Sequence, residues 1–292
     1  MTFDSRRVIA LAPAKINLAL HVTGRRADGY HLLDTLAVFT QAGDRLMLEP
    51  AEADRFTLSG PMAGKLDPDG PNLVTAARDL LRTAHPFPPV AIHLEKNLPV
   101  ASGIGGGSSD AAAALRGLNT LFSLGLATRL LAELSLPLGA DLPMCVHARP
   151  LRAEGIGEAI TPLAAHPVLH MVLANPGVAM STPSVFKALA SPDNPPLPDP
   201  AMVHPADLPG WLAAHSRSDL QAPACTLAPG ISACLAALQA TSPLLARMSG
   251  SGATCFALYD DAKTARAAAN RVAKAHPQWF VEATTTLEET DA

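Results

Sequence analysis

The chain has 292 residues, of which 48% are hydrophobic and 16% charged, with a formal net charge of -4. It is too apolar and too weakly charged to be intrinsically disordered, and at ~100–200 residues per domain its length favours two domains. The sequence pI of ≈ 6.2 and the scattered basic residues leave no electrostatic footprint for a polyanion. We therefore expect a small-molecule ligand and no nucleic-acid partner.

The sequence pattern also argues against membrane insertion and disulfide chemistry. Mean hydropathy is +0.19, yet every apolar stretch is broken by proline, histidine or a charge before the ~18 residues that a membrane-spanning helix needs. Charges in residues 1–7 precede a strand-like run and leave no room for a signal or transit peptide, so we expect a cytoplasmic protein with no membrane partner. The cysteines lack CxxC spacing and are interpreted as buried apolar residues: Cys145, Cys225, Cys234 and Cys255.

The start of the chain is predicted to be rich in β-strands. Within residues 8–22, large apolar side chains recur at every second position and so lie on one face of an extended chain. This period of two favours a half-buried strand. Two further strand-like runs, over 32–39 and 45–50, are each preceded by turn residues, at Asp28-Gly29 and Gly43-Asp44. We expect both pairs to interrupt the strands.

Helical patterns follow in the rest of the N-terminal half. Asn72 is predicted to cap a helix over 73–84, which a group of prolines ends before a strand over 90–100. A glycine cluster then opens an alanine-rich helix over 110–122. One more helix is predicted over 127–139.

The C-terminal half favours an α+β domain, with helices on one side of an antiparallel sheet. The Pro-rich segment 191–210 is predicted to be an irregular surface loop or lid and not a packed element. The two halves differ in motif content, which places the domains at 1–165 and 166–292. The expected elements are strands over 168–176, 253–260 and 278–287 and helices over 184–190, 230–240 and 262–275.

A glycine-rich loop between a strand and a helix is the strongest functional signal. Glycine lets the backbone approach a ligand closely, and unpaired N–H groups at the start of the following helix attract an anion. Phosphate fits this arrangement, and two serines that follow the glycines supply hydroxyls to phosphate oxygens or to Mg²⁺. The residues are Gly103, Gly105, Gly106, Gly107, Ser108 and Ser109.

Three known phosphate loops fit the pattern less well. A Walker A loop needs a lysine before the serine, and none stands between Lys96 and Lys187. The Rossmann fingerprint needs glycine where Ser108 stands, and in protein kinases the loop is followed by a strand. The remaining alternative is a tight turn without a ligand, although such a turn does not require four close glycines and two serines.

Two ionisable residues stand in apolar surroundings and have open interpretations. Lys15 lies in the first strand with Asn17 on the same face, so it is either paired and functional or an edge lysine that reaches solvent. Asp141, alone in an uncharged stretch, is either a desolvated catalytic group or the N-cap of a short helix. A second glycine cluster at 248–256 carries little weight by itself.

Five segments occur in an order that resembles the GHMP family of small-molecule kinases. The glycine-serine loop is shared by the whole family. The first, second and fourth segments resemble more specifically the members that act on a cytidine-diphosphate-linked methylerythritol. The segments are PAKINL at 13–18, RADGYHLL at 26–33, LPVASGIGGGSSDAA at 98–112, LPLGADLPMCV at 136–146 and RMSGSGATCF at 247–256.

The resemblance implies an α+β, two-domain GHMP kinase fold with the active site in the interdomain cleft. The N-terminal, ATP-binding domain would resemble the second domain of ribosomal protein S5, and the C-terminal domain would be ferredoxin-like. The implied reaction is direct in-line transfer of the γ-phosphoryl group of ATP to the 2-hydroxyl of the methylerythritol, in the non-mevalonate route to isoprenoid precursors. Mg²⁺ would be held mainly by phosphates and water, since no protein ligand can be assigned.

The resemblance also implies roles for individual residues. Asp141 matches the general base, which also contacts substrate, and Lys15 matches the lysine paired with it. The substrate-binding positions are Asn17 for the erythritol and Tyr30, His31 and Phe186 for the cytosine, with Thr182 beside Phe186 in the same loop. Gly250 and Gly252 match a third family motif that would line the active site from the C-terminal domain. The ATP-binding positions are Pro99, Val100, Ala101, Ser102, Gly103, Ile104, Gly105, Gly106, Gly107, Ser108 and Ser109, with Lys96 and Asn72 at the nucleoside.

Other functions stay open at this point. Homoserine, mevalonate and galactose kinases share the glycine-serine loop, but the cytosine-facing residues argue against these acceptors. A nucleotide sensor on the same fold would be expected to lose Lys15 or Asp141, and both are present. A dinucleotide-dependent oxidoreductase is disfavoured by Ser108. The sequence does not distinguish a monomer from a homodimer.

Overall fold

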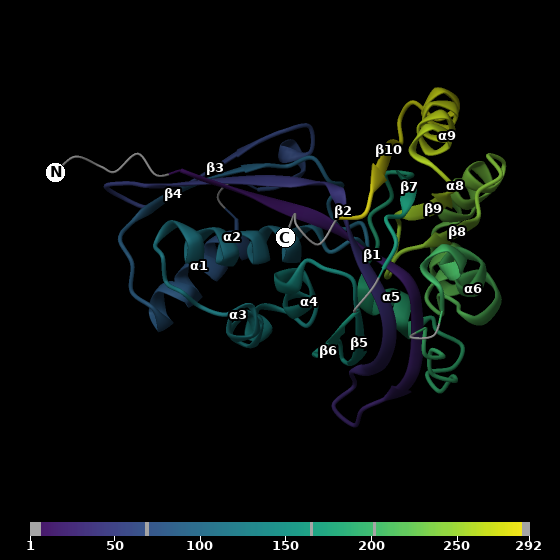
Figure 1. Cartoon of the computed structure of the whole chain (residues 1–292), viewed down its shortest axis with the longest axis horizontal. Helices are drawn as coiled ribbons and strands as arrows, with labels where there is room; N and C mark the ends of the chain where they lie inside the picture. The colour runs from purple at the N-terminus through teal and green to yellow at the C-terminus, as the bar shows by residue number, and fades with distance from the viewer. Residues whose placement is uncertain (1–6, 68–69, 164–165, 201–202, 288–292) are drawn as a thin grey trace. The chain divides into compact units, whose positions relative to one another are not determined.

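The computed structural model describes residues 7–67, 70–163, 166–200 and 203–287, whose helices and strands are drawn in Figure 1. The chain divides into two compact units. Unit 1 comprises Met1–Ala14, Gly43–Val100 and Gly105–Ala148, and unit 2 comprises Lys15–Ala42, Ala101–Ile104 and Arg149–Ala292. This division differs from two consecutive domains that meet at residue 165, a position outside the described residues. The difference arises because the long N-terminal strands and the glycine-rich loop each contribute residues to both units.

The first two strands are longer than the sequence pattern predicts. β1 (Val8–Arg25) and β2 (His31–Pro50) pair with each other, joined by the expected turn at Asp28-Gly29. The interruption expected at Gly43-Asp44 is wrong, because β2 continues through both residues. A Cβ on Gly43 would lie 2.6 Å from the carbonyl oxygen of Ala12, so glycine here permits close approach of the β1 backbone.

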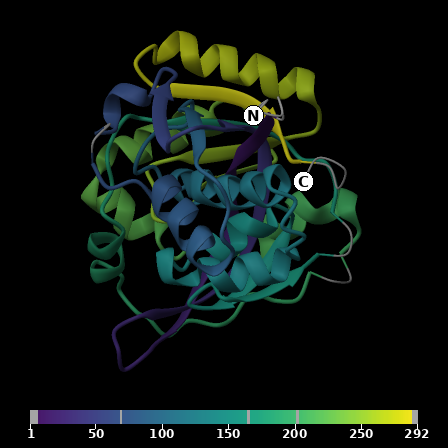
Figure 2. The ribbon, with the colours of Figure 1, turned by 90° about the vertical axis from the view of Figure 1, so that its left-hand side faces the viewer.

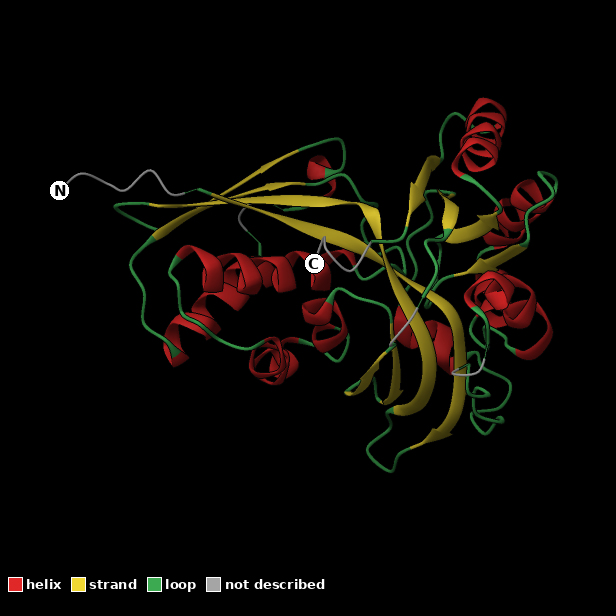
Figure 3. Cartoon of the chain, viewed as in Figure 1, coloured by secondary structure: helices red, strands yellow, loops and turns green. Residues whose placement is uncertain are grey.

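Unit 1 places helices on one face of its strands (Figure 3). The second half of β2 pairs antiparallel with β4 (Val90–Glu95), and β4 pairs in parallel with β3 (Arg55–Ser59). Alanines of α2 are buried, and a Cβ on Gly117 would meet Leu48 at 2.7 Å, so small residues let α2 pack closely on β2. The helices are α1 (Leu73–Ala84), α2 (Gly106–Leu121), α3 (Thr128–Ser135) and α4 (Leu142–His147), with short 3₁₀ turns at Ala63–Lys65 and Leu136–Leu138.

Unit 2 contains an antiparallel sheet in the order β10-β7-β9-β8. The helices α8 (Pro229–Gln239) and α9 (Ala262–Ala275) supply apolar side chains to a core that they share with this sheet, and α9 runs beside β10 (Figure 2). This arrangement confirms the α+β prediction for the C-terminal half. The strands are β7 (His170–Asn175), β8 (Leu245–Met248), β9 (Cys255–Tyr259) and β10 (Phe280–Thr285).

The first half of β2 also belongs to unit 2. It pairs with β5 (Leu151–Gly155), which in turn pairs with β6 (Ala159–Pro162). The remaining elements of unit 2 are the helices α5 (Thr182–Lys187), α6 (Leu208–His215) and α7 (Gln221–Leu227) and a 3₁₀ turn at Pro205–Asp207. In the part of the chain that the structure describes, no single helix is long and apolar enough to cross a membrane; α7 and α8 reach that measure only together, bent by 120°.

The Pro-rich segment is an irregular surface loop over 191–200, as predicted, and it is anchored to the fold at Pro195 and Leu197. Leu197 is 2% exposed, and its N–H donates to Asp34 Oδ2 at 2.8 Å while its carbonyl accepts from Arg152 at 2.9 Å. The carbonyl of Pro195 accepts from Arg217 at 2.6 Å and lies 3.1 Å from a ring nitrogen of buried His21. The prediction of an irregular surface loop is therefore confirmed over 191–200, but it is wrong at the end of the segment, where α6 already begins at Leu208.

Candidate active site

The two glycine clusters meet in unit 2. Gly103 has a φ of +74°, and a Cβ on it would lie 2.6 Å from the backbone of Gly252. Gly250 has a φ of +54°, and a Cβ there would lie 2.5 Å from the Gly103 carbonyl oxygen. The Thr254 N–H also donates to the Ser102 carbonyl at 3.0 Å. The cluster at 248–256, which is uninformative alone, thus packs directly on the first part of the phosphate loop.

β1 joins the same assembly through its backbone. The Lys15 N–H donates to the Ile104 carbonyl at 2.9 Å, and the Asn17 N–H donates to Ser249 Oγ at 3.0 Å. Lys15 is 3% exposed and Asn17 is 2% exposed. The interpretation of Lys15 as an edge lysine that reaches solvent is therefore wrong, because a buried lysine needs a partner or a function.

The Asn17 side chain is held in one orientation. The Thr35 hydroxyl donates to the Ala19 carbonyl at 2.6 Å, so its oxygen accepts from Asn17 Nδ2 at 2.8 Å. The amide orientation follows from this chain of donors and acceptors. Asn17 Oδ1 is buried and has no hydrogen-bond partner among the described residues. A buried acceptor of this kind is available to a donor from a ligand.

In unit 1 the second part of the loop becomes the start of α2. Gly105, with a φ of +66°, precedes the helix, whose first N–H groups have no partner within the helix. Ser109 is fully buried, and its hydroxyl donates to the Pro13 carbonyl at 2.7 Å. This bond assigns the Ser109 hydroxyl to the fold, so the geometry does not support a ligand contact for it. Ser108, which is partly exposed, is the loop hydroxyl that suits a phosphate.

Lys96 forms a buried ion triad with two carboxylates that the sequence did not single out. Its Nζ donates to Asp44 at 2.5 Å and to Asp110 at 2.7 Å. Asp44 also accepts the N–H groups of Asn97 and Leu98. Because all three side chains are buried, Lys96 has a structural role under the loop, where a Cβ on Gly106 would lie 3.3 Å from Nζ. A direct contact of Lys96 with the nucleoside is not supported.

The charge balance of this triad depends on Asp110. Burial raises the pKa of Asp110 to about 8, although Lys96 opposes the shift. Burial also disfavours the charge on Lys96, but Asp110 and Asp44 outweigh it and raise the pKa of that ammonium. Asp110 Oδ1 has no hydrogen-bond partner within the described residues. The raised pKa favours a protonated Asp110 at neutral pH, so Asp44 carries the negative charge that balances Lys96.

Asn72 is the N-cap of α1, as predicted. Its Oδ1 accepts the Val74 N–H at 2.8 Å, which satisfies one of the free donors at the helix start. The oxygen of Asn72 is therefore committed to the helix. Its predicted contact with the nucleoside gains no support from this geometry.

Asp141 stands at the N-cap position of α4 but makes no capping hydrogen bond with its side chain. The interpretation of Asp141 as a capping carboxylate is thus not borne out. At the other end of α4, Arg116 of α2 donates to the Cys145 carbonyl at 2.7 Å and also to the Leu11 carbonyl at 2.8 Å. Burial lowers the pKa of Arg116 to about 10, so it stays charged at neutral pH. Asp141 lies in unit 1 and Lys15 in unit 2, and their pairing stays a prediction.

The predicted cytosine-binding residues are partly together. His31 stacks on Phe186 with ring centroids 4.7 Å apart and an interplanar angle of 19°. Tyr30, the third residue that the resemblance implies for the cytosine, is 57% exposed. The face of Phe186 that the resemblance assigns to the cytosine is stacked against His31 in this structure. Burial, with a smaller effect of Arg25, lowers the pKa of His31 and favours the neutral ring. Thr182 Oγ1 lies 2.8 Å from Ser251 Oγ, which links α5 to the second glycine cluster.

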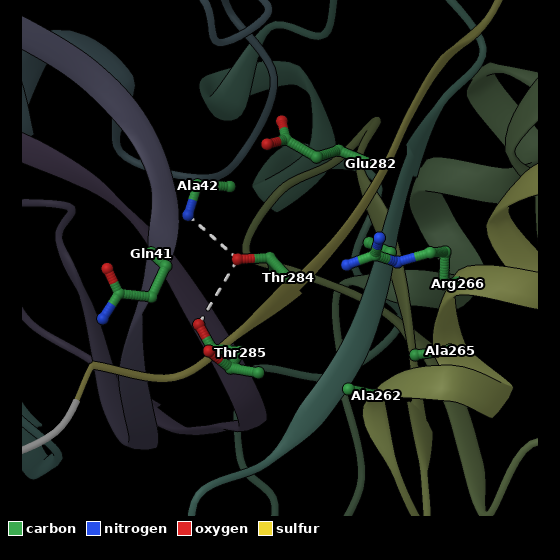
Figure 4. A pocket seen from close by; sticks show the side chains of 9 residues that line it. Gln41, Ala42, Ala262, Ala265, Arg266, Glu282, Thr284 and Thr285 are labelled. Carbon is green, nitrogen blue, oxygen red and sulfur yellow. Dashed lines mark hydrogen bonds between the residues drawn. The ribbon is translucent and has the colours of Figure 1, made fainter.

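A cavity of about 290 Å³ lies elsewhere in unit 2, between α9, β10 and β2 (Figure 4). Its Thr284 hydroxyl accepts the Ala42 N–H at 2.9 Å and donates to the Thr285 carbonyl at 3.3 Å, so it is used within the fold. None of the predicted site residues lines this cavity. Across the described residues, no group of three or more His, Cys, Asp or Glu side chains is arranged to hold a metal ion, and the Mg²⁺ prediction is untested by this geometry.

Family models match both parts of the chain. The model of the GHMP kinases N terminal domain matches residues 72–149, and the model of the GHMP kinases C terminal matches residues 207–278. The first match contains the segments at 98–112 and 136–146, and the second contains the segment at 247–256.

Similar proteins cover nearly the whole chain. A 4-diphosphocytidyl-2-C-methyl-D-erythritol kinase from Brucella melitensis is 54% identical over 94% of this chain and 93% of its own length. A protein of the same name from Rhizobium etli is 54% identical over 97% of this chain and 96% of its own length. A crystal structure of 4-(cytidine 5'-diphospho)-2C-methyl-D-erythritol kinase has a TM-score of 0.78 at 33% identity and covers 96% of this chain and 100% of its own. A crystal structure of a homoserine kinase from Cytophaga hutchinsonii shares the fold, with a TM-score of 0.69 at 17% identity. It covers 98% of this chain and 96% of its own.

Proposed function

The chain belongs to the GHMP kinase family and is a phosphotransferase, and we propose that its acceptor is 4-diphosphocytidyl-2-C-methyl-D-erythritol. In this proposal the enzyme transfers the γ-phosphoryl group of ATP to the 2-hydroxyl of that substrate, a step toward isoprenoid precursors. Relatives of that name at 54% identity support the choice of acceptor.

The observation that carries the proposal is the contact of three motif segments in unit 2. Residues 15–17, 101–104 and 249–254 are joined by backbone hydrogen bonds and by glycines that admit no Cβ. Such close backbone packing is expected where amides must surround a phosphate, and it is not needed for a simple turn.

The proposed chemistry follows from the residue types. Asp141 accepts the proton of the 2-hydroxyl as the oxygen attacks phosphorus in line with the leaving diphosphate. Lys15 keeps that carboxylate ionised and offsets charge on the transferring group. Mg²⁺ bound with ATP supplies further charge neutralisation, held mainly by phosphates and water. The free N–H groups at the start of α2, with Ser108, hold phosphate oxygens.

Recognition of the acceptor is assigned to β1, the turn after it and α5. Asn17 Oδ1 accepts a hydroxyl of the erythritol, because its amide nitrogen is already used by Thr35. Neutral His31 offers one donor and one acceptor to the cytosine edge. Phe186 offers its ring face to the cytosine when His31 leaves its stacked position on that ring. Exposed Tyr30 moves onto the other face of the cytosine at little cost in buried surface.

The test is ADP release with Mg²⁺-ATP and four acceptors offered separately: the cytidine compound, mevalonate, homoserine and galactose. We expect turnover on the cytidine compound alone. Turnover on another acceptor would retain the ATP site but contradict the assignment of the cytosine-binding residues. Absence of turnover on all four would favour a nucleotide sensor on the same fold.

A further inference from the structure

Ser249 lies where the three motif segments of unit 2 meet, and it is fully buried. Its Oγ accepts the Asn17 N–H at 3.0 Å and donates to the Gly103 carbonyl at 3.2 Å. Its own N–H donates to the Thr254 carbonyl at 2.9 Å. One side chain thus connects β1, the phosphate loop and the second glycine cluster.

The direction of each hydrogen bond is fixed by the partners. A backbone N–H can only donate and a carbonyl can only accept, so the single hydroxyl hydrogen of Ser249 is committed to Gly103. The oxygen is left to accept from Asn17. Removing this hydroxyl, as in Ser249→Ala, would leave the buried Asn17 N–H donor and the buried Gly103 carbonyl acceptor without this partner.

The bond to Gly103 sets the direction of the next amide. Because a trans peptide is planar, a Gly103 carbonyl that faces Ser249 turns the Ile104 N–H to the opposite side. The Ile104 carbonyl is held in the same way by the Lys15 N–H, which turns the Gly105 N–H away from β1. Neither the Ile104 nor the Gly105 N–H has a hydrogen-bond partner in the described part of the chain. Successive free amides of this kind form a concave anion site.

We propose that Ser249 is a positioning residue for phosphoryl transfer, whose hydroxyl turns the Ile104 amide toward the ATP phosphates and holds β1 in register with the loop. The inference rests on the proposed function, because it assumes that ATP is the ligand of the loop. Ser249 acts through backbone groups and contacts neither substrate. Its loss therefore affects ATP first, and the acceptor alcohol only through the position of Asn17.

The experiment compares Ser249→Ala with Ser249→Thr, which keeps the hydroxyl, and with Ser249→Cys, a weaker donor. Thr286→Val is the matched control, because the Thr286 hydroxyl is also buried and accepts a backbone N–H, that of Leu169, at 3.0 Å. For each protein we would measure kcat, KM for ATP, KM for the alcohol, the calorimetric affinity for ADP and the melting temperature.

For Ser249→Ala we expect kcat/KM for ATP to fall by about 10- to 100-fold, the effect of losing a buried hydrogen-bond partner. The affinity for ADP should fall with it, KM for the alcohol should change less, and Ser249→Thr should recover most of the loss. Thr286→Val should lower the melting temperature without changing the kinetics.

Unchanged ATP kinetics and ADP affinity in Ser249→Ala, with only a lower melting temperature, would show a purely structural residue and overturn the proposal. If Ser249→Ala does not fold, Ser249→Cys decides: reduced ATP affinity supports the proposal and wild-type kinetics contradict it. Wild-type protein that binds no ADP would instead refute the proposed function itself.

Discussion

At the residue scale, Asp141 is the side chain on which the proposed chemistry depends most. It occupies the N-cap position of α4 without a capping hydrogen bond from its side chain, and the proposed function assigns it the role of general base. The Asp141→Asn variant keeps the shape and removes the base. We expect kcat to fall by roughly two to four orders of magnitude, with ATP affinity preserved in a calorimetric titration. Turnover like that of the wild type would remove Asp141 from the mechanism.

Thr35 sets what Asn17 can recognise. Its hydroxyl donates to Ala19 and so fixes Asn17 Oδ1 as the free group of the amide. In Thr35→Val the amide can turn over and present its nitrogen instead. We expect KM for the acceptor alcohol to rise by about tenfold while KM for ATP stays constant, the loss expected for one hydrogen bond.

Thr35→Ser, which keeps the hydroxyl, is the control for that experiment and should restore KM for the alcohol. Equal effects of Thr35→Val on both substrates would contradict a role in orienting Asn17.

The Asp110 carboxyl predicts how stability depends on pH. Its pKa is raised by burial to about 8 in the folded state, against ~4 when unfolded, so between these pH values the folded state binds more protons. The free energy of unfolding therefore falls as pH rises through this window. Asp110→Asn cannot ionise and should lose this part of the decline.

The measurement is urea unfolding at pH 5, 7 and 9, with the wild type and Asp110→Asn compared at each pH. The variant should gain stability relative to the wild type as pH rises. If the difference in the free energy of unfolding between the two proteins stays constant from pH 5 to pH 9, Asp110 does not titrate in that range.

Local sequence reveals which residues are unusual but not their partners. Lys15 and Asn17 stand out because they interrupt an apolar strand, and both are buried. Asp44 follows Gly43, and this local pattern is typical of a turn. Its pairing with Lys96 could not be predicted, because the two residues are 52 positions apart in the sequence. Ser249 and Thr35 gave no signal, since a serine or threonine in a glycine cluster or a strand has no distinctive local pattern.

At the element scale, the Pro-rich segment is anchored to the strands β2 and β5 through the backbone of Leu197. Arg152 of β5 forms two hydrogen bonds with Asp34 of β2, at 2.8 and 2.7 Å, and both residues hold Leu197. Arg152→Met would leave the buried Asp34 carboxylate without its cation, and the segment 191–200 should open more often.

Limited proteolysis measures this opening, and cleavage within 191–200 should accelerate by on the order of tenfold in Arg152→Met. The exposed pair Arg129 and Glu133 on α3 gives a control, because Arg129→Met removes a cation that holds no loop. Equal cleavage rates in Arg152→Met and Arg129→Met would contradict the claim that Arg152 anchors the segment 191–200.

Elements with strong local signals were predicted well. α1 begins after its Asn72 cap, and α9 follows Asp261, whose carboxylate accepts the Thr264 N–H. Short elements such as β8 and α7 were missed, because their pattern is set by contacts with distant segments. Arg247 of β8, for example, donates to the carbonyls of Leu18, Leu212 and Ser216.

At the scale of the whole molecule, composition and alternating elements indicate an α+β protein but not how the chain is shared between units. Consecutive domains are the simplest expectation, whereas unit 1 and unit 2 each contain separate stretches of the chain. In long strands such as β1 and β2, no local sequence pattern indicates the residue at which the strand passes from one unit to the other. The order of the five motif segments, by contrast, led directly to the family that the comparisons show.

The measurement that tests the central claim most directly is identification of the product by phosphorus and carbon NMR. The protein would be incubated with Mg²⁺-ATP and 4-diphosphocytidyl-2-C-methyl-D-erythritol. We predict one new phosphomonoester resonance coupled to carbon 2 of the methylerythritol, with the diphosphate intact and one ADP formed per product. A phosphate on another hydroxyl, or ADP formed without any new ester, would contradict the assignment of the substrate and its 2-hydroxyl.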